Sequence, residues 1–133
     1  MQIFDPLRKK HVNRTPEEEV RQAIIRWLAD DRKVPMTLMA SEYSFTFNGR
    51  QYRSDIVVFD RELNPLMMVE CKAPSVSLDR DVIDQVIRYN KVLKVRFILI
   101  SNGKTSYLCA WNPERGLYEF SDRVPEYQEM IQQ

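Results

Sequence analysis

Residues 67–74, M-M-V-E-C-K-A-P, decide the fold class of this chain. An apolar run that a proline stops is typical of a buried strand, in which residues two apart share a face. Glu70 and Lys72 therefore project from one face at the end of a core element. A carboxylate and an ammonium at such a place are costly unless they are paired or bound to a metal. A strand that ends at the surface with a solvated Glu and Lys is the simpler interpretation of this stretch alone.

The length and composition indicate a single domain. The chain has 133 residues and a formal net charge of +1, so any surface that binds nucleic acid must be local. We interpret Cys71 and Cys109, which lie in apolar runs, as buried free thiols. The single histidine, His11, excludes a zinc site built on paired histidines. No signal peptide and no membrane-spanning run are recognisable, so we expect a soluble, cytoplasmic protein without a membrane partner.

A basic leader, residues 1–14, precedes the first predicted helix. We interpret it as solvated, with contact to DNA phosphates as the alternative. Thr15, Pro16 and Glu18 then predict a helix start with an N-cap, a proline at the first position and a capping box. Apolar residues repeat at intervals of three and four up to about residue 29, which indicates an amphipathic helix. Glu17 lies at the tip of this apolar stripe and is the acid best placed to enter a site.

Three strands in meander order are predicted next. Asn48-Gly49 is a strong hairpin signal, with an alternating run before it and residues 51–59 after it. The second strand is apolar on both faces at its centre, which predicts a central position in the sheet. Asp55 begins this apolar segment, and a turn then leads back into the strand that carries Glu70. The two acids are therefore expected on neighbouring strands.

The remaining elements predict a mixed sheet. A helix is expected from about residue 78 to 92, with Gln85 and Tyr89 on one face. The apolar run at residues 95–101 follows this helix, and a strand reached through a helix is expected to be parallel to the strand before it. The predicted fold class is α/β, with a mixed central sheet flanked by helices.

The predicted domain has the element order αβββαβ within a core of residues 15–111. Residues 112–133 are expected to add an edge strand and a short helix. The chain has only three glycines and no glycine-rich loop that would hold a nucleotide phosphate, which argues against a nucleotide-hydrolysing fold.

Converging carboxylates suit a hard divalent cation. Asp55 and Glu70 offer only oxygen ligands, which favours Mg²⁺ or Mn²⁺. The backbone carbonyl of Cys71 lies between two polar side chains and is a further candidate ligand. Lys72 beside the ion is suited to positioning an attacking water or to stabilising charge on a phosphate. These groups suit attack of a metal-activated water on phosphorus, without a cysteine or serine nucleophile.

The pattern Asp55…Glu70-Cys71-Lys72 resembles the PD-(D/E)XK nuclease motif, with Ser54 where the motif has proline. The closer resemblance is to the N-terminal nuclease domain of type I restriction enzyme R subunits, over roughly residues 15–111. It is carried by Thr15-Pro16-Glu17-Glu18 with Val20-Arg21-Gln22, by residues 52–58, 69–74 and 84–90, and by Ser101-Asn102-Gly103.

This resemblance implies a restriction-endonuclease-like core and metal-dependent hydrolysis of DNA phosphodiester bonds, in restriction or DNA processing. It makes Glu17 an active-site acid, although the neighbouring Glu18 is not excluded by the pattern, and it matches Gln85 and Tyr89 to a Gln-x-x-x-Tyr helix. The expected site consists of Lys72, Glu17 and Gln85 as catalytic residues, Asp55, Glu70 and the Cys71 carbonyl as metal ligands, and Arg50, Arg53 and Tyr89 as substrate-binding residues.

Other interpretations stay open. The chain is alternatively a DNA-binding or assembly module without catalysis, or an interaction protein whose acids are only solvated. DNA is the expected partner, with a homodimer or a larger restriction-type assembly left open. Helicase motor domains follow this module in R subunits, so we expect these residues not to translocate DNA by themselves. In the module without catalysis, the phosphates would be held by Arg50, Arg53, Lys91, Lys94 and Arg96.

Overall fold

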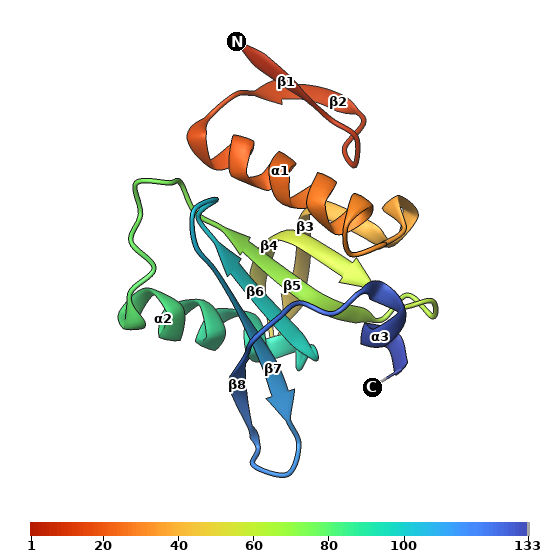
Figure 1. Cartoon of the computed structure of the whole chain (residues 1–133), viewed down its shortest axis with the longest axis vertical. Helices are drawn as coiled ribbons and strands as arrows, with labels where there is room; N and C mark the ends of the chain where they lie inside the picture. The colour runs from red at the N-terminus through yellow and green to blue at the C-terminus, as the bar shows by residue number, and fades with distance from the viewer. Residues whose placement is uncertain (133) are drawn as a thin grey trace.

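The computed structural model describes residues 1–132 and places a six-stranded mixed sheet at the centre of the molecule. Helix α1 covers one face of the sheet and helix α2 the other (Figure 1). The strands follow the order β3-β4-β5-β6-β7-β8, in which only β5 and β6 are parallel among the described residues. The elements are β1 (Gln2–Asp5), β2 (Lys10–Asn13), α1 (Pro16–Asp30), η1 (Met36–Leu38), β3 (Met39–Phe47), β4 (Arg50–Phe59), β5 (Pro65–Cys71), α2 (Arg80–Asn90), η2 (Lys91–Leu93), β6 (Phe97–Ser101), β7 (Ser106–Asn112), β8 (Leu117–Ser121) and α3 (Tyr127–Gln132).

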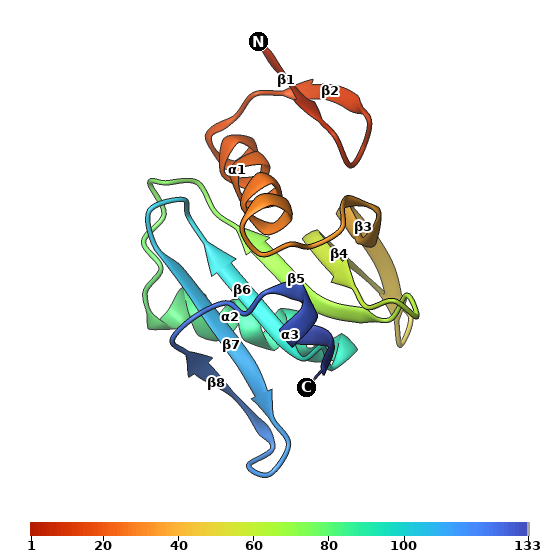
Figure 2. The ribbon, with the colours of Figure 1, turned by 45° about the vertical axis from the view of Figure 1, so that its right-hand side comes forward.

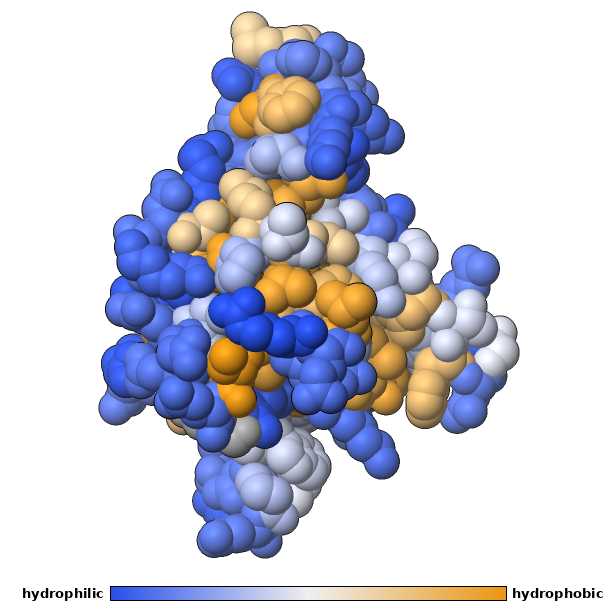
Figure 3. Space-filling view, turned by 90° about the vertical axis from the view of Figure 1, so that its right-hand side faces the viewer, coloured by the Kyte–Doolittle hydropathy of each residue, from blue (hydrophilic) through white to orange (hydrophobic). Residues whose placement is uncertain are grey.

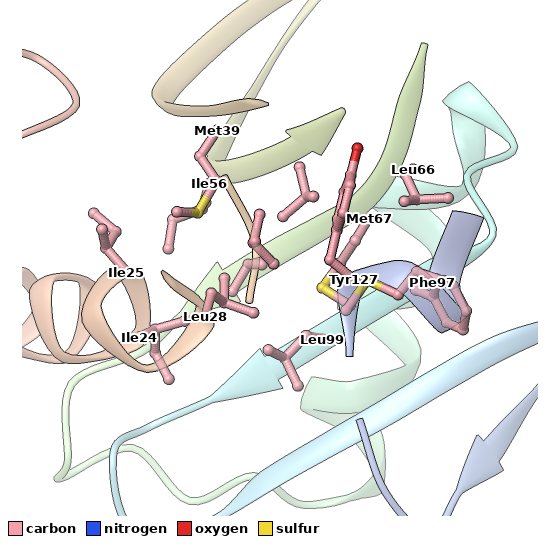
Figure 4. Packing of buried hydrophobic residues seen from close by; sticks show 14 of the residues in the cluster. Ile24, Ile25, Leu28, Met39, Ile56, Leu66, Met67, Phe97, Leu99 and Tyr127 are labelled. Carbon is pink, nitrogen blue, oxygen red and sulfur yellow. The ribbon is translucent and has the colours of Figure 1, made fainter. Parts of the chain in front are cut away.

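Helix α1 begins where the sequence predicts. Thr15 Oγ1 accepts a hydrogen bond from the Glu18 N–H at 3.0 Å, and Pro16 occupies the first turn. The helix buries its apolar stripe against the centre of the sheet. Figure 4 shows Ile25 and Leu28 directed towards the strands, in the cluster that contains Met67 from β5. Burial on this face fixes the α1 side chains relative to the ends of β4 and β5.

Most side chains of residues 1–14 are exposed, but the segment is folded and is not an irregular leader. These residues form the hairpin β1–β2, which lies beyond α1 from the sheet (Figure 2). Asp5 is fully buried and pairs with Arg8, and Arg8 Nη2 also donates to Glu18 Oε1 at 2.8 Å. The Glu18 carboxylate also accepts from Gln22, so it faces these partners instead of closing the predicted capping box. Hydrophobic periodicity does not reveal such a hairpin, because buried charge pairs anchor it to α1.

Helix α2 closes the opposite face. Asp79 Oδ1 accepts from the Val82 N–H at 3.0 Å, so the helix begins slightly later than the sequence predicts. Ile83 and Val86 pack into a second apolar cluster with residues of β4, β5 and β6. Strand β5 is thereby buried on both faces, which explains its continuous apolar run.

The predicted β3–β4 hairpin is confirmed. Asn48 and Gly49 have φ values of 52° and 77°, as a tight type I′ connection requires. Strand β3 begins three residues later than the sequence predicts, because Met36–Leu38 forms a 3₁₀ turn after Pro35.

Figure 3 shows apolar side chains gathered in the middle of one face, with hydrophilic residues around them. Within residues 1–132, no helix has the length and hydrophobicity to cross a bilayer.

Candidate active site

The candidate site lies where strands β4 and β5 stop pairing. The last paired residues at that end are Ile56 and Val69, so Asp55 and Glu70 are the next residues along the two strands. The Cys71 N–H donates to Asp55 Oδ2 at 2.7 Å, so a side chain takes the place of a main-chain acceptor. The structure therefore brings Asp55 and Glu70 together at the open end of β4 and β5.

A cleft of about 740 Å³ opens at this end of the sheet. Seven of the nine predicted site residues line it. Arg50 does not; its guanidinium lies over the Tyr52 ring, 5.2 Å from the ring centroid. Cys71 is buried beneath the site. The lining residues are Glu17, Ser44, Gln51, Tyr52, Arg53, Asp55, Glu70, Lys72, Gln85, Val86 and Tyr89.

Helix α1 brings Glu17 to the cleft from the face opposite α2. Burial raises the pKa of the Glu17 carboxyl above its ordinary value, and the charge of Asp55 raises it further. Glu18, the neighbouring alternative, points instead towards Arg8 and Gln22. Of the two glutamates, Glu17 is therefore the one that reaches the site.

Glu70 is the most perturbed carboxyl of the cleft. Burial raises the pKa of Glu70 to about 7, with a further contribution from the negative charge of Asp55. Lys72 opposes this rise, and its Nζ lies 3.7 Å from Glu70 Oε2. Burial also raises the pKa of Asp55, while the Cys71 N–H and the guanidinium of Arg21 act in the opposite direction. Two partly buried carboxylates that repel each other favour the binding of a cation between them.

Arg21 and Glu42 belong to the site although the sequence analysis assigned a site role to neither of them. Arg21 is only 4% exposed and forms an ion pair with Glu42 of β3. Its Nη2 lies 3.6 Å from Asp55 Oδ1 and 3.7 Å from Glu17 Oε1. The spacing of four residues between Glu17 and Arg21 on α1 is the one sequence signal that indicated a shared face.

The outer wall of the cleft contains two of the three predicted substrate-binding residues, Arg53 and Tyr89. Tyr89 Oη accepts a hydrogen bond from the Arg53 N–H at 3.1 Å, which ties α2 to β4. The Arg53 side chain is 67% exposed, and its Nε lies 3.1 Å from Glu42 Oε2. The alternative of a DNA-binding module without catalysis relied on five basic residues. One of them, Arg96, is bound within the protein, because its Nη1 donates a hydrogen bond to the Met130 carbonyl at 3.2 Å. Only Arg53 of that group lines the cleft.

The donor set fits a loosely held ion better than a protein cage. Among residues 1–132, no three His, Cys, Asp or Glu side chains are grouped so that they could hold one metal ion. Mg²⁺ usually binds to one or two carboxylates and keeps waters or takes phosphate oxygens as further ligands. Asp55 and Glu70 supply such a pair, with the Cys71 carbonyl as the candidate third ligand. Burial raises the pKa of the Cys71 thiol well above its ordinary value, so this residue is unsuited to act as a nucleophile.

The family described as "Type I restriction enzyme R protein N terminus (HSDR_N)" matches residues 16–125. The chain belongs to this family. The match includes α1 and all nine predicted site residues, and it leaves the β1–β2 hairpin outside. Membership of the R protein N-terminus family relates this chain to type I restriction enzymes, as the sequence predicts.

One solved structure resembles this R protein N-terminus domain. It is a fragment of a putative HsdR subunit of a type I restriction enzyme from Vibrio vulnificus YJ016, with a TM-score of 0.51 and 21% sequence identity. The similarity covers 71% of this chain and 20% of that one, so the chain spans about a fifth of that protein's length. This likeness supports a shared fold. No curated protein matches the sequence.

Proposed function

We propose that this chain is a metal-dependent deoxyribonuclease module of the PD-(D/E)XK type with a restriction-endonuclease-like fold. One observation carries the proposal: Asp55, Glu70 and Lys72 meet at the open end of β4 and β5, in a cleft that Glu17 and Gln85 also line. The R protein N-terminus family supports a role in restriction. The substrate that we propose is the phosphodiester backbone of DNA.

The residues divide the work by position. Asp55 and Glu70 would hold Mg²⁺ or Mn²⁺ with the Cys71 carbonyl, and a bound ion supplies charge neutralisation and an activated water. Lys72 presents an ammonium beside Glu70, where it positions water or stabilises a developing phosphate charge. Glu17 approaches from α1 and is suited to orienting a water.

The outer residues of the cleft, together with the exposed Arg50 that does not line it, are suited to the DNA backbone. Gln85 offers an amide to a water or a phosphate oxygen, and Tyr89 lies beside it on α2. Arg53 and Arg50 are exposed cations on β4 that suit non-bridging phosphate oxygens. We expect the chain to act within a restriction-type assembly, and a homodimer is a further expectation that ultracentrifugation would measure.

The second candidate function is a module that binds DNA without cutting it. Two observations favour this alternative. No group of three metal-binding side chains exists within residues 1–132, and Asp55 already lies next to the guanidinium of Arg21. The same cleft would then hold phosphates through Arg53 and Lys72 alone.

Cleavage of plasmid DNA by the purified chain separates the two functions. We expect cutting with Mg²⁺ or Mn²⁺, none with EDTA, and loss of cutting in Asp55→Asn, Glu70→Gln and Lys72→Ala. Glu114→Gln, an exposed acid between β7 and β8, is the matched control and should cut normally. DNA binding without cleavage under every metal condition would support the non-catalytic module, and no affinity for DNA would exclude both functions.

A further inference from the structure

We infer that Glu42 and Arg21 form a positioning unit that fixes the carboxylate of Asp55 from the side opposite β5. The inference deepens the proposed function, because Asp55 is the proposed ligand of the metal. Neither residue is assigned a catalytic step. Their role is to hold Asp55 in one orientation before any cation arrives.

The main chain of β3 places Glu42 next to Asp55. The paired positions Ser41–Ile56 and Tyr43–Ser54 flank Glu42, which places it opposite Asp55 across the β3–β4 ladder. Glu42 has a φ of 55°, in the left-handed region that residues other than glycine rarely adopt. Backbone strain of this kind persists where the surrounding structure over-determines it, often at functional sites.

The partner of Glu42 explains the strained conformation. The Glu42 carboxylate accepts from Arg21 Nη1, and Arg21 reaches this position from α1. Arg21 is 4% exposed, so its guanidinium is held among acids with little access to water. A buried guanidinium presents several donors in a fixed plane, which a lysine in its place would not do.

The two oxygens of Asp55 are thereby restrained from different elements. Oδ2 accepts from the Cys71 N–H of β5 at 2.7 Å, while Oδ1 lies 3.6 Å from Arg21 Nη2. Glu42 fixes Arg21, and Arg21 in turn fixes Asp55. Catalytic groups require orientation by neighbours of this kind, because a misplaced ligand loses much of its effect. The link extends to the cleft wall, since Glu42 also pairs with Arg53.

Amide hydrogen exchange of the metal-free chain tests the inference directly. The Cys71 N–H is bound by the Asp55 side chain, whereas the next amide, Lys72 N–H, donates to the Ser101 carbonyl at 2.8 Å. We expect Glu42→Ala to speed exchange at Cys71 at least tenfold with little change at Lys72. Equal loss of protection at both amides, or none at Cys71, would overturn the inference.

Matched variants separate positioning from general loosening. Glu129→Ala is the control, because Glu129 also pairs with an arginine, Arg123 at 2.8 Å, in a part of the chain remote from the cleft. It should leave exchange at Cys71 unchanged. Glu42→Gln retains an oxygen that can accept from Arg21, so it should restore part of the protection that Glu42→Ala removes.

Calorimetric titration with Mn²⁺ gives an independent readout. We expect Glu42→Ala and Arg21→Lys each to weaken Mn²⁺ binding at least tenfold. The Mn²⁺ affinity of the double variant should equal that of the single variant that binds Mn²⁺ less tightly. Unchanged or tighter binding in the single variants would contradict a positioning role. A wild-type chain that binds no Mn²⁺ would remove the proposed metal site, and exchange at Cys71 would still decide whether Glu42 and Arg21 hold Asp55.

Discussion

The Cys71 N–H donates a hydrogen bond to Asp55 Oδ2 over 2.7 Å, so the main chain of β5 holds a carboxylate of β4. The contact lies just beyond the last paired residues of the two strands, Ile56 and Val69. It keeps Asp55 beside Glu70 although both acids are partly buried and repel each other.

Replacing Asp55 should separate metal binding from folding. Asp55→Asn keeps a carbonyl oxygen that can accept from Cys71 N–H, and it removes the charge that repels Glu70. We expect Mn²⁺ affinity to fall at least ~100-fold, because one of two charged ligands is lost, and the melting temperature of the metal-free chain to stay close to wild type. Calorimetry and thermal unfolding measure the two effects. A variant that binds Mn²⁺ like wild type would show that Asp55 is no ligand.

Glu70 should make stability depend on pH. The folded pKa of about 7 exceeds the ordinary value of 4.5, so the folded state binds more protons between these values. The free energy of unfolding should therefore fall as pH rises from 4.5 through 7. Since each pKa unit corresponds to about 1.4 kcal/mol, the loss attributable to Glu70 is on the order of 3 kcal/mol.

Urea denaturation in EDTA measures this pH effect. Glu70→Gln should match wild type near pH 4 and be more stable than wild type at pH 8. Mn²⁺ at pH 8 should return stability to the wild-type chain only. A difference between the two proteins that stays constant over this pH range would contradict the assignment, and the exposed Glu114→Gln variant is the control.

Lys72 should matter for turnover more than for metal binding. Its ammonium lies 3.7 Å from Glu70 and faces the cleft, where it is suited to act on water or phosphate. We expect Lys72→Ala to reduce DNA cleavage by roughly 10²- to 10⁴-fold, while Mn²⁺ affinity changes by no more than a few-fold. Single-turnover cleavage and calorimetry provide the two numbers. Cleavage at the wild-type rate would remove Lys72 from the mechanism.

The N-terminal hairpin should contribute to stability through its buried charges. Asp5 is fully buried and pairs with Arg8, which also binds Glu18. Arg8→Ala leaves two buried carboxylates without their partner and should lower the free energy of unfolding by about 2–4 kcal/mol. Chemical denaturation measures the change, with the exposed Lys10→Ala as control. Equal stability of the two variants would show that the hairpin is only loosely attached.

Local sequence signals predict the framework of the site. Thr15-Pro16 starts α1, Asn48-Gly49 turns the β3–β4 hairpin, and the apolar run before Glu70 marks a central strand. Each signal depends on residues close together in the chain, so it can be recognised without knowledge of the tertiary contacts. The meander order then suffices to place Asp55 and Glu70 on neighbouring strands.

The tertiary structure alone decides how the acids are held. Arg21 comes from α1 and Glu42 from β3, and they form an ion pair in which Glu42 has a left-handed φ. No periodic pattern in the sequence predicts that these two residues meet. The hairpin that binds Glu18 is likewise built on buried charge pairs instead of an apolar repeat. Sequence determined which elements form and which acids they carry, because propensity and hydrophobic burial act locally. Their orientation was set only in the folded chain, because ion pairs between distant segments form there.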